Sequence, residues 1–244
     1  MSTSPAEAQP RPKRERPVIA IDGPAGAGKS TMAAHLARRF GFLNLETGAM
    51  YRALALKAIQ SDLGFDDEAA LMDIASRTKI RLEPQMEGNR VLLDGQDVSR
   101  RVREADVTAA ASQVSVHPRL RAWMVEQQRL LGERGGVVME GRDIVTVVFP
   151  DAEVKIFLDA APEVRGNRRY KQTMPGEAAP ARVTESSIVQ ELKERDARDR
   201  NRADSPLRPA DDAVVLDSTS MTLDEVLAAA EQVVRKHLTE RQLH

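Results

Sequence analysis

A lysine and a serine that follow a glycine-rich turn form the pattern in this chain with the clearest chemical meaning. The nine residues are Gly23, Pro24, Ala25, Gly26, Ala27, Gly28, Lys29, Ser30 and Thr31. Backbone N–H groups in such a turn can surround phosphate oxygens, and the N-terminus of a following helix adds partial positive charge. The lysine can bind β- and γ-phosphates, and the serine hydroxyl can ligate Mg²⁺. The pattern therefore predicts a binding site for a nucleoside triphosphate.

The flanking residues indicate which elements hold this turn. An apolar run at 18–22 predicts a buried strand before it. Apolar residues at helical spacing follow it, namely Met32, Ala33, Leu36, Ala37 and Phe40. A tight strand-to-helix turn with a chance lysine is the alternative, which the presence of both elements disfavours. The motif alone does not say what is done with the nucleotide.

Two other charged groups are expected near element ends, where open α/β sheets bind ligands. A helix is predicted to open with Thr47 as its N-cap and with Tyr51 and Arg52 in its first turn. A phosphate there would meet a helix N-terminus and a guanidinium together. The residues at 140–143, Glu-Gly-Arg-Asp, follow an apolar run at 137–139. The alternatives are a surface charge at Arg52 with packing at Tyr51, and an ordinary polar turn at 140–143.

A basic helix is predicted to carry Arg165, Arg168 and Arg169 and to end near 174–176. The loop at 173–182 that follows is rich in Pro, Ala and Gly. A basic helix beside a mobile loop suits a lid that closes over phosphates. Surface salt bridges are the alternative for these arginines.

The helix predicted over 186–202 carries a stripe that begins apolar and becomes charged. Its members are Ile188, Leu192, Arg195, Asp199 and Arg202. A face that changes in this way is typical of a helix that leaves the core and enters a polar cleft. A solvated helix with i, i+4 ion pairs is the alternative.

The composition narrows the classes of function. The chain has 244 residues, a formal net charge of −1, 3% aromatic residues and no cysteine. Near-zero charge and few aromatics disfavour a nucleic-acid partner. The absence of cysteine excludes disulfides, thiolate metal sites and a cysteine nucleophile, and suits the cytoplasm.

The N-terminal residues and the hydropathy of the chain indicate whether a tail or a membrane span is expected. Residues 1–16 are rich in Pro, Ser and Arg. We expect a disordered tail there, and a basic nucleic-acid-binding arm is the alternative. No apolar window reaches the length of a membrane span, so no membrane partner is expected.

The remaining pattern alternates strands with helices and predicts an α/β fold, a parallel sheet flanked by helices. Further strands are expected at 42–45, 154–159 and 213–217, and further helices at 66–77, 101–115, 119–133 and 222–238. Residues 79–82 and 90–93 predict an antiparallel hairpin, followed by a short strand at 96–98. These strands interrupt the alternation, so we interpret roughly 78–98 as an insertion.

With these segments in view, the chain closely resembles bacterial cytidylate kinases over about 17–240. The segments that carry the resemblance stand in family order at 19–31, 46–52, 111–114, 141–144, 146–152, 155–159, 191–203 and 206–207. The resemblance implies phosphoryl transfer from ATP to CMP or dCMP, giving ADP and CDP or dCDP, with Mg²⁺ required. It implies a monomer.

The resemblance also implies a P-loop NTPase fold with a five-stranded parallel sheet. Its core would comprise 17–46, 115–164 and 183–240. A monophosphate-binding subdomain, enlarged by a small antiparallel sheet, would span about 47–114, and a lid about 165–182.

The family's functional residues carry over by motif. The resemblance assigns catalytic roles to Lys29, Arg142, Arg168 and Arg202. ATP would be bound by residues 23–31 with Arg165, Arg168 and Arg169. The acceptor and its phosphate would be held by Thr47, Tyr51, Arg52, Arg142 and Arg202. The cytosine would be read by Ser112, Arg121 and Asp143, and the ribose by Arg195 and Asp199. Mg²⁺ would be ligated by Ser30, and through water by Glu140.

The chain departs from the family pattern at two places. Glu46-Thr47 stands where Asp-Ser or Asp-Thr is usual, and Val145 stands where glycine is usual. We expect Val145 to shift the backbone after Asp143.

Two other functions remain open. One is a kinase for another monophosphate such as UMP, although a carboxylate at Asp143 complements the N4 amine of cytosine. The other is a nucleotide-dependent binding switch, which near-zero charge and few aromatics disfavour. The chain lacks the Asn-Lys-x-Asp motif of GTPases.

Overall fold

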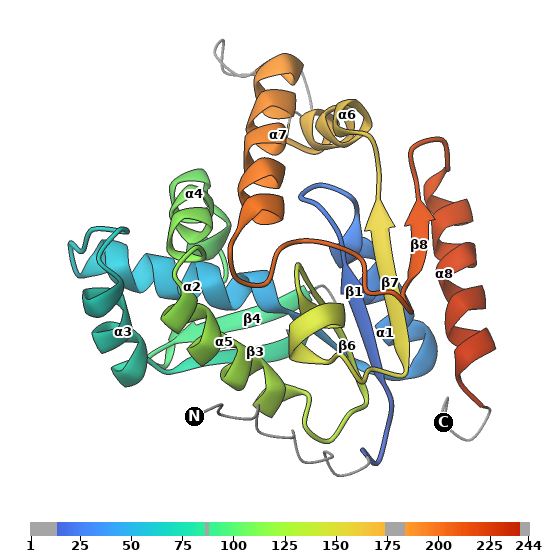
Figure 1. Cartoon of the computed structure of the whole chain (residues 1–244), viewed down its shortest axis with the longest axis horizontal. Coiled ribbons are helices and arrows are strands. Elements are labelled where there is room, and N and C mark those ends of the chain that lie inside the picture. The colour runs from blue at the N-terminus through green and yellow to red at the C-terminus, as the bar shows by residue number, and fades with distance from the viewer. Residues whose placement is uncertain (1–13, 86–87, 174–183, 240–244) are drawn as a thin grey trace, which may run out of the picture.

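The computed structural model describes residues 14–85, 88–173 and 184–239, and at its centre lies a five-stranded sheet. The strands are all parallel in the order β2-β6-β1-β7-β8 (Figure 1). Their bounds are β1 Val18–Asp22, β2 Leu43–Glu46, β6 Val137–Gly141, β7 Val154–Asp159 and β8 Val214–Asp217. The predicted α/β fold with a five-stranded parallel sheet is confirmed.

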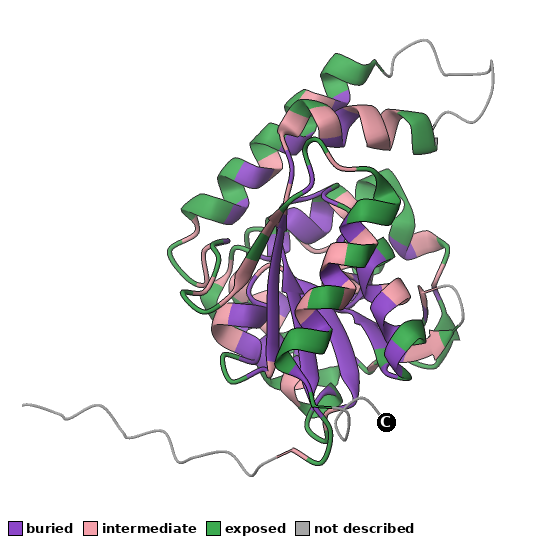
Figure 2. Cartoon of the chain, turned by 90° about the vertical axis from the view of Figure 1, so that its right-hand side faces the viewer, coloured by how far each residue is buried: buried purple, intermediate pink, exposed green. Residues whose placement is uncertain are grey.

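Both faces of this sheet are covered by helices, so its central strands are apolar on both sides. On β1, Val18 and Ala20 pack in one apolar cluster with α2 (Thr47–Gln60) and α5 (Pro118–Leu131). Ile19 and Ile21 point the opposite way and pack with α1 (Lys29–Phe40) and α8 (Leu223–His237). Figure 2 shows the buried strands between helices whose outer faces are exposed. The continuous apolar run at 18–22 is the consequence of this double burial.

A second, antiparallel sheet follows α2 and α3 (Glu68–Arg77) and forms the predicted insertion. Its order is β3-β4-β5, with bounds β3 Ile80–Gln85, β4 Gly88–Leu93 and β5 Gln96–Asp97. The buried Asn89 joins it to the main sheet. Its Oδ1 accepts a hydrogen bond from the N–H of Glu46 at 2.8 Å, and its Nδ2 donates to the carbonyl of Asn44 at 2.7 Å. The insertion is therefore fixed to the end of β2.

The single helix predicted over 101–115 is wrong. A 3₁₀ turn, η1 (Arg101–Arg103), precedes the helix α4 (Ala105–Val114). Glu104 separates them in an extended conformation, with φ −70° and ψ 153°. Neither glycine nor proline marks this break in the sequence, and the extended residue turns α4 onto α2.

The helices α6 (Pro162–Thr173) and α7 (Glu185–Asn201) lie beyond the upper ends of β1 and β7 in Figure 1. They pack closely, since a Cβ added at Gly166 would lie 2.2 Å from Val189 Cγ2. The stripe predicted on α7 is confirmed at its apolar end, where Ile188 and Leu192 are buried. Most of the predicted mobile loop at 173–182 lies outside the described residues.

Residues 1–13 of the tail expected over 1–16 lie outside the described part. Arg14 and Arg16 are described, and both are in contact with the domain. Arg14 donates to Asp151 Oδ2 at 2.9 Å, and the guanidinium of Arg16 lies 4.8 Å from the ring centre of Phe42. The segment before β1 is therefore anchored. In the described ranges no helix is long and apolar enough to cross a membrane.

Candidate active site

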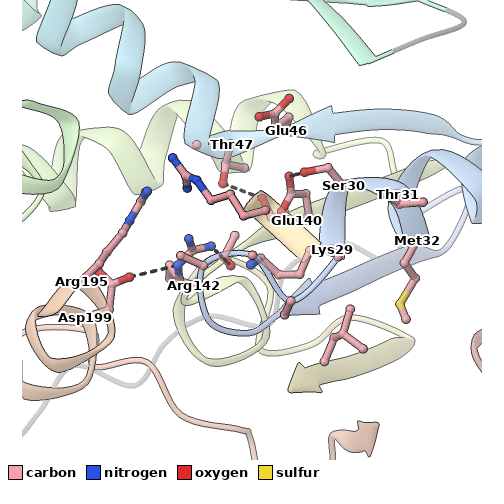
Figure 3. A pocket seen from close by; sticks show the side chains of 18 of the residues that line it. Lys29, Ser30, Thr31, Met32, Glu46, Thr47, Glu140, Arg142, Arg195 and Asp199 are labelled. Carbon is pink, nitrogen blue, oxygen red and sulfur yellow. Dashed lines mark hydrogen bonds and ion pairs between the residues drawn. The ribbon is translucent and has the colours of Figure 1, made fainter. Parts of the chain in front are cut away.

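A cleft of about 740 Å³ opens at the carboxyl ends of β1 and β6. The turn after β1 lines one side of it, and α2, α4 and α5 line another. Cationic side chains from α6 and α7 face it as well. Figure 3 shows side chains from the start of α1, the junction of β2 and α2, the end of β6 and α7 around this cleft. This is the place at which open parallel sheets bind ligands.

The turn after β1 requires glycine at two points. Gly23 has φ +149°, and a Cβ there would lie 1.9 Å from the carbonyl oxygen of Leu158. Gly28 has φ +102° and caps α1, which begins at Lys29. The backbone can therefore fold tightly against β7 and present the N-terminus of α1 to the cleft, as a phosphate-binding loop does.

Lys29 is buried at the base of this loop, with 5% of its surface exposed. Its Nζ donates to the carbonyl of Pro24 at 2.7 Å. Burial, followed by the nearby charge of Arg142, lowers the pKa of Lys29 to about 7, while Glu140 and Asp22 oppose the shift. A buried cation with one carbonyl partner is stabilised by an arriving anion, so a phosphate would favour its charged form.

Ser30 and Glu140 meet across the loop. The Ser30 hydroxyl donates to Glu140 Oε1 at 2.7 Å. Mg²⁺ in phosphoryl-transfer enzymes takes one or two protein oxygens and completes its shell with phosphates and waters. A hydroxyl and a carboxylate side by side at the loop fit such an ion. Within the described ranges there is no group of three or more His, Cys, Asp or Glu residues that could hold a metal.

Opposite the loop, arginines gather around Asp199 on α7. Arg142 Nε donates to Asp199 Oδ2 at 3.0 Å (Figure 3). Arg202 Nη1 lies 3.8 Å from Asp199 Oδ1. Burial, and then the charge of Arg142, lowers the pKa of the neighbouring Arg195 to about 10. Several guanidinium groups thus share one carboxylate, and this excess of positive charge suits a polyanionic ligand.

A buried ion pair lies deeper in the cleft. Arg121 Nη2 donates to Asp143 Oδ2, and Arg121 Nη1 donates to the carbonyl of Ser115 at 3.0 Å. Arg121 and Asp143 are 3% and 4% exposed. The Tyr51 hydroxyl nearby is buried with no hydrogen-bond partner among the described residues, and burial raises the pKa of Tyr51 to about 12. These buried polar groups can orient a small polar ligand.

The backbone after Asp143 is held from below by Asp22, at the end of β1. Asp22 Oδ2 accepts a hydrogen bond from the N–H of Val145 at 2.8 Å. Asp22 is fully buried, its Oδ1 has no partner in the described part, and burial followed by the charge of Asp143 raises its pKa to about 7. Val145 is not among the described residues with positive φ, so this position does not require glycine. Val145 lies within η2 (Ile144–Val148), a short π-type turn that follows Asp143.

Comparison with known proteins agrees with this geometry. The family model described as cytidylate kinase matches residues 19–236. The chain belongs to the cytidylate kinase family. A cytidylate kinase of Solibacter usitatus is 48% identical over 227 residues, which cover 93% of this chain and 96% of that protein. One from Aeromonas salmonicida is 48% identical over 212 residues, covering 87% of this chain and 91% of that protein.

Most residues that the cytidylate kinase pattern singled out line the one cleft. From the loop side these are Ala25, Gly26, Ala27, Gly28, Lys29, Ser30 and Thr31. From the other elements they are Thr47, Tyr51, Arg52, Ser112, Arg121, Glu140, Arg142, Asp143, Arg168, Arg169, Arg195, Asp199 and Arg202. Gly23 and Pro24 shape the loop from below without lining the cleft.

Arg165 departs from the expected pattern for an ATP ligand. It is 1% exposed, and its guanidinium donates to the carbonyls of Ala160 and Ala25 and to Asp196 Oδ2 at 2.5 Å. These partners belong to the loop itself, to the residue after β7 and to α7, and Arg165 is not among the residues that line the cleft. The expected direct contact with ATP is therefore corrected: Arg165 supports the loop from below. Its neighbour Arg168 does face the cleft and donates to Ser218.

Thr47 also differs from its expected local role. Glu46 is the N-cap of α2, and the Thr47 hydroxyl donates to the carbonyl of Glu140 at 2.7 Å. The hydroxyl thus ties α2 to the end of β6 instead of capping its own helix.

Reasoning from the sequence overlooked Asp22, Arg103 and Ser218. Asp22 reads as the last residue of an apolar strand, and Arg103 is one of several arginines in a charged segment. No local sequence pattern distinguishes Asp22 or Arg103. Their contacts are with Val145 and Glu46, which lie more than forty positions away in the sequence.

Proposed function

We propose that this protein transfers the γ-phosphoryl group of ATP to CMP and dCMP, giving ADP and CDP or dCDP. The observation that carries the proposal is the buried Asp143–Arg121 pair in the same cleft as the phosphate-binding loop. A carboxylate held in place by an arginine can accept a hydrogen bond from the N4 amine of cytosine. Membership of the cytidylate kinase family over residues 19–236 supports the same reaction.

The donor would lie over the loop at 23–31. Loop N–H groups and the N-terminus of α1 would bind its phosphates, with Arg168 and Arg169 on the opposite side. Mg²⁺, held by Ser30 directly and by Glu140 through water, would neutralise charge on these phosphates. Lys29 would stabilise the charge that develops on the transferred group.

The acceptor would lie between α2, α4 and α7. Thr47, Tyr51 and Arg52 would hold its phosphate end, together with Arg142 and Arg202, which also face the transferred group. Ser112 would join Asp143 and Arg121 at the base, and Arg195 with Asp199 would meet the ribose hydroxyls. The acceptor phosphate is already anionic, so positioning and charge stabilisation suffice without a strong general base.

The proposal extends to organisation and location. The insertion at about 47–114 would act as the monophosphate-binding subdomain, and about 165–182 as a lid. The protein would act as a monomer in the cytoplasm, with nucleotides as its partners and without nucleic acid or membrane.

A coupled assay of ADP release tests the proposal across CMP, dCMP, UMP, AMP, GMP and dTMP with ATP and Mg²⁺. We expect CMP and dCMP to give kcat/KM values at least ~10-fold above the others, the scale of one well-placed base contact. Preferred turnover of UMP would make the protein a kinase for another monophosphate. Nucleotide binding without turnover of any acceptor would contradict the kinase assignment altogether.

A further inference from the structure

The buried carboxylate of Asp22, at the end of β1, is costly to the fold. Its side chain is fully buried, and its Oδ1 has no hydrogen-bond partner among the described residues. A buried carboxylate with an unpaired oxygen costs free energy, because its lost hydration is not replaced. Groups that break the rules of the core in this way concentrate at functional sites. Asp22 is therefore a candidate for a role in the neighbouring cleft.

The turn after Asp143 is capped from a distance. Asp143 occupies the N-cap position of η2, but its side chain makes no hydrogen bond to the described N–H groups of that turn. An aspartate at an N-cap ordinarily accepts a hydrogen bond from the N–H two or three residues further on, and Val145 lies two residues on. Asp22, which stands 123 positions earlier, accepts this hydrogen bond through its Oδ2 at 2.8 Å.

This exchange of caps leaves the carboxylate of Asp143 to other partners. Its Oδ2 accepts a hydrogen bond from Arg121, which is itself fixed by the carbonyl of Ser115 at 3.0 Å. Arg121 and Asp143 line the cleft, whereas Asp22 is not among the lining residues. A carboxylate that capped its own turn would be directed to the backbone. Asp22 can therefore act on a ligand only through Asp143.

Asp22 also connects the turn to the central sheet. β1 pairs with β6 in parallel, and Asp22 lies opposite Gly141, two residues before Asp143. The next residue in the chain, Gly23, opens the phosphate-binding loop. The hydrogen bond to Asp22 thus fixes the turn to the strand that leads into this loop. A side chain supported by a sheet is held more precisely than one supported by a loop alone.

We infer that Asp22 is a positioning residue for the base site. It caps the turn after Asp143 in place of Asp143 itself, and so leaves the Asp143 carboxylate to Arg121 and to the base of the acceptor. The inference rests on the proposed function for the identity of that base, cytosine. The cap itself can be measured without any nucleotide.

Four variants separate the cap from the packing around it. Asp22→Ala removes the oxygen that accepts from Val145, and Asp22→Val removes it with less loss of buried volume. Asp22→Asn retains an oxygen there and removes the charge. Lys155→Met is the control on the adjacent strand β7. Lys155 is buried, pairs with Asp212 at 2.6 Å and is not among the residues that line the cleft.

The measurements are kcat/KM for CMP and UMP, KM for ATP, and amide hydrogen exchange at Val145 by NMR. Asp22→Ala and Asp22→Val should narrow the CMP/UMP ratio at least ~10-fold, the scale of one base contact, with little change in the KM for ATP. Exchange at Val145 should become faster relative to the amides of β1. Asp22→Asn should keep most of the ratio and of the protection. Lys155→Met should keep both, even where it lowers the Tm.

An unchanged CMP/UMP ratio in a folded Asp22→Ala or Asp22→Val protein would overturn the inference. A raised KM for ATP with the same ratio would overturn it too, because Asp22 would then support the loop and not the base site. So would a ratio that narrows equally in Lys155→Met, since general loss of stability would explain it. A wild type with no preference for CMP would contradict the proposed function instead. Exchange at Val145 would then decide the inference, and equal protection in wild type and Asp22→Ala would refute the cap.

Discussion

The two halves of the cleft, which we propose hold the phosphoryl donor and the acceptor, are built in different ways. The donor half is one continuous turn, residues 23–31, closed by Ser30 and Glu140. The acceptor half draws its side chains from α2, α4, α5, the end of β6 and α7, which lie far apart in the sequence. Phosphate binding is thus a local property of the chain, whereas recognition of the acceptor depends on the tertiary fold.

The halves also differ in what holds their cations. The buried Lys29 of the donor half donates to a backbone carbonyl. In the acceptor half Arg52, Arg121 and Arg142 are each paired with a carboxylate. In the proposed function the acceptor would compete with acidic side chains for these arginines, which would make the acceptor half sensitive to the chemistry of its ligand.

The largest effect on stability is expected at Arg165, through which α6 supports the loop of the donor half. Arg165→Ala removes the partner of the buried Asp196 and two hydrogen bonds to backbone carbonyls, one of them of Ala25 in the loop. Breaking a buried ion pair costs about 3–5 kcal/mol, since one charge stays unpaired. Denaturant unfolding should show a loss of this size in the free energy of unfolding.

Lys193→Ala is the control for this variant. Lys193 pairs with Glu163 at 2.8 Å across the same two helices, with both side chains exposed. Its loss should cost no more than ~1 kcal/mol. Equal stability of the two variants would contradict the claim that the buried Arg165 stabilises the donor loop from a distant segment.

Asp22 lies between the two halves and gives a pH-dependent effect. Burial raises its pKa from the ordinary value of 3.8 to about 7 in the native state. The native protein keeps the proton over a range in which the unfolded chain has lost it. The contribution of Asp22 to stability therefore falls from about pH 4 to about pH 7, by up to about 4 kcal/mol, and is constant above.

Asp22→Asn removes this fall and retains an oxygen that can accept from the Val145 N–H. The variant should exceed the wild type in stability at pH 8 and approach it near pH 4. Unfolding in denaturant at pH 4, 6 and 8 measures the difference. An identical difference at all three pH values would contradict a raised pKa of Asp22 in the native state.

Lys29→Ala tests the donor half alone. Loss of one electrostatic stabiliser of the transition state should lower kcat at least ~100-fold. Because Lys29 donates its hydrogen bond to Pro24 within the loop, the KM for CMP should change little. Steady-state kinetics and circular dichroism check this together. Near-normal kcat in a folded variant would remove Lys29 from the proposed mechanism.

The contrast between the halves also explains what the sequence could predict. The strand at 18–22, the turn and α1 follow from local rules, namely apolar runs, glycine and helical spacing. The break at Glu104, the inward turn of Arg165 and the Thr47–Glu140 contact depend on segments far along the chain. Helical spacing places Arg165, Arg168 and Arg169 on one basic helix but does not distinguish the one that the loop buries.

Acceptor residues were named by resemblance, and the structure brings them together in one cleft. Their individual roles stay predictions. The altered backbone expected after Asp143, where Val145 replaces the usual glycine, also stays a prediction. The φ angle of Val145 is not positive, and its N–H is bound by Asp22. An apolar cluster that includes Ile144 and Val148 accommodates the valine side chain.

The central claim is that the acceptor half reads the base through Asp143, and the CMP/UMP ratio of kcat/KM tests it most directly. Cytosine offers an amine where uracil offers a carbonyl oxygen, so a carboxylate attracts the first and repels the second. Asp143→Asn removes the charge at constant size and should narrow the ratio at least ~10-fold, while Arg121→Ala should weaken both acceptors without favouring UMP. An unchanged ratio in a folded Asp143→Asn protein would contradict the claim.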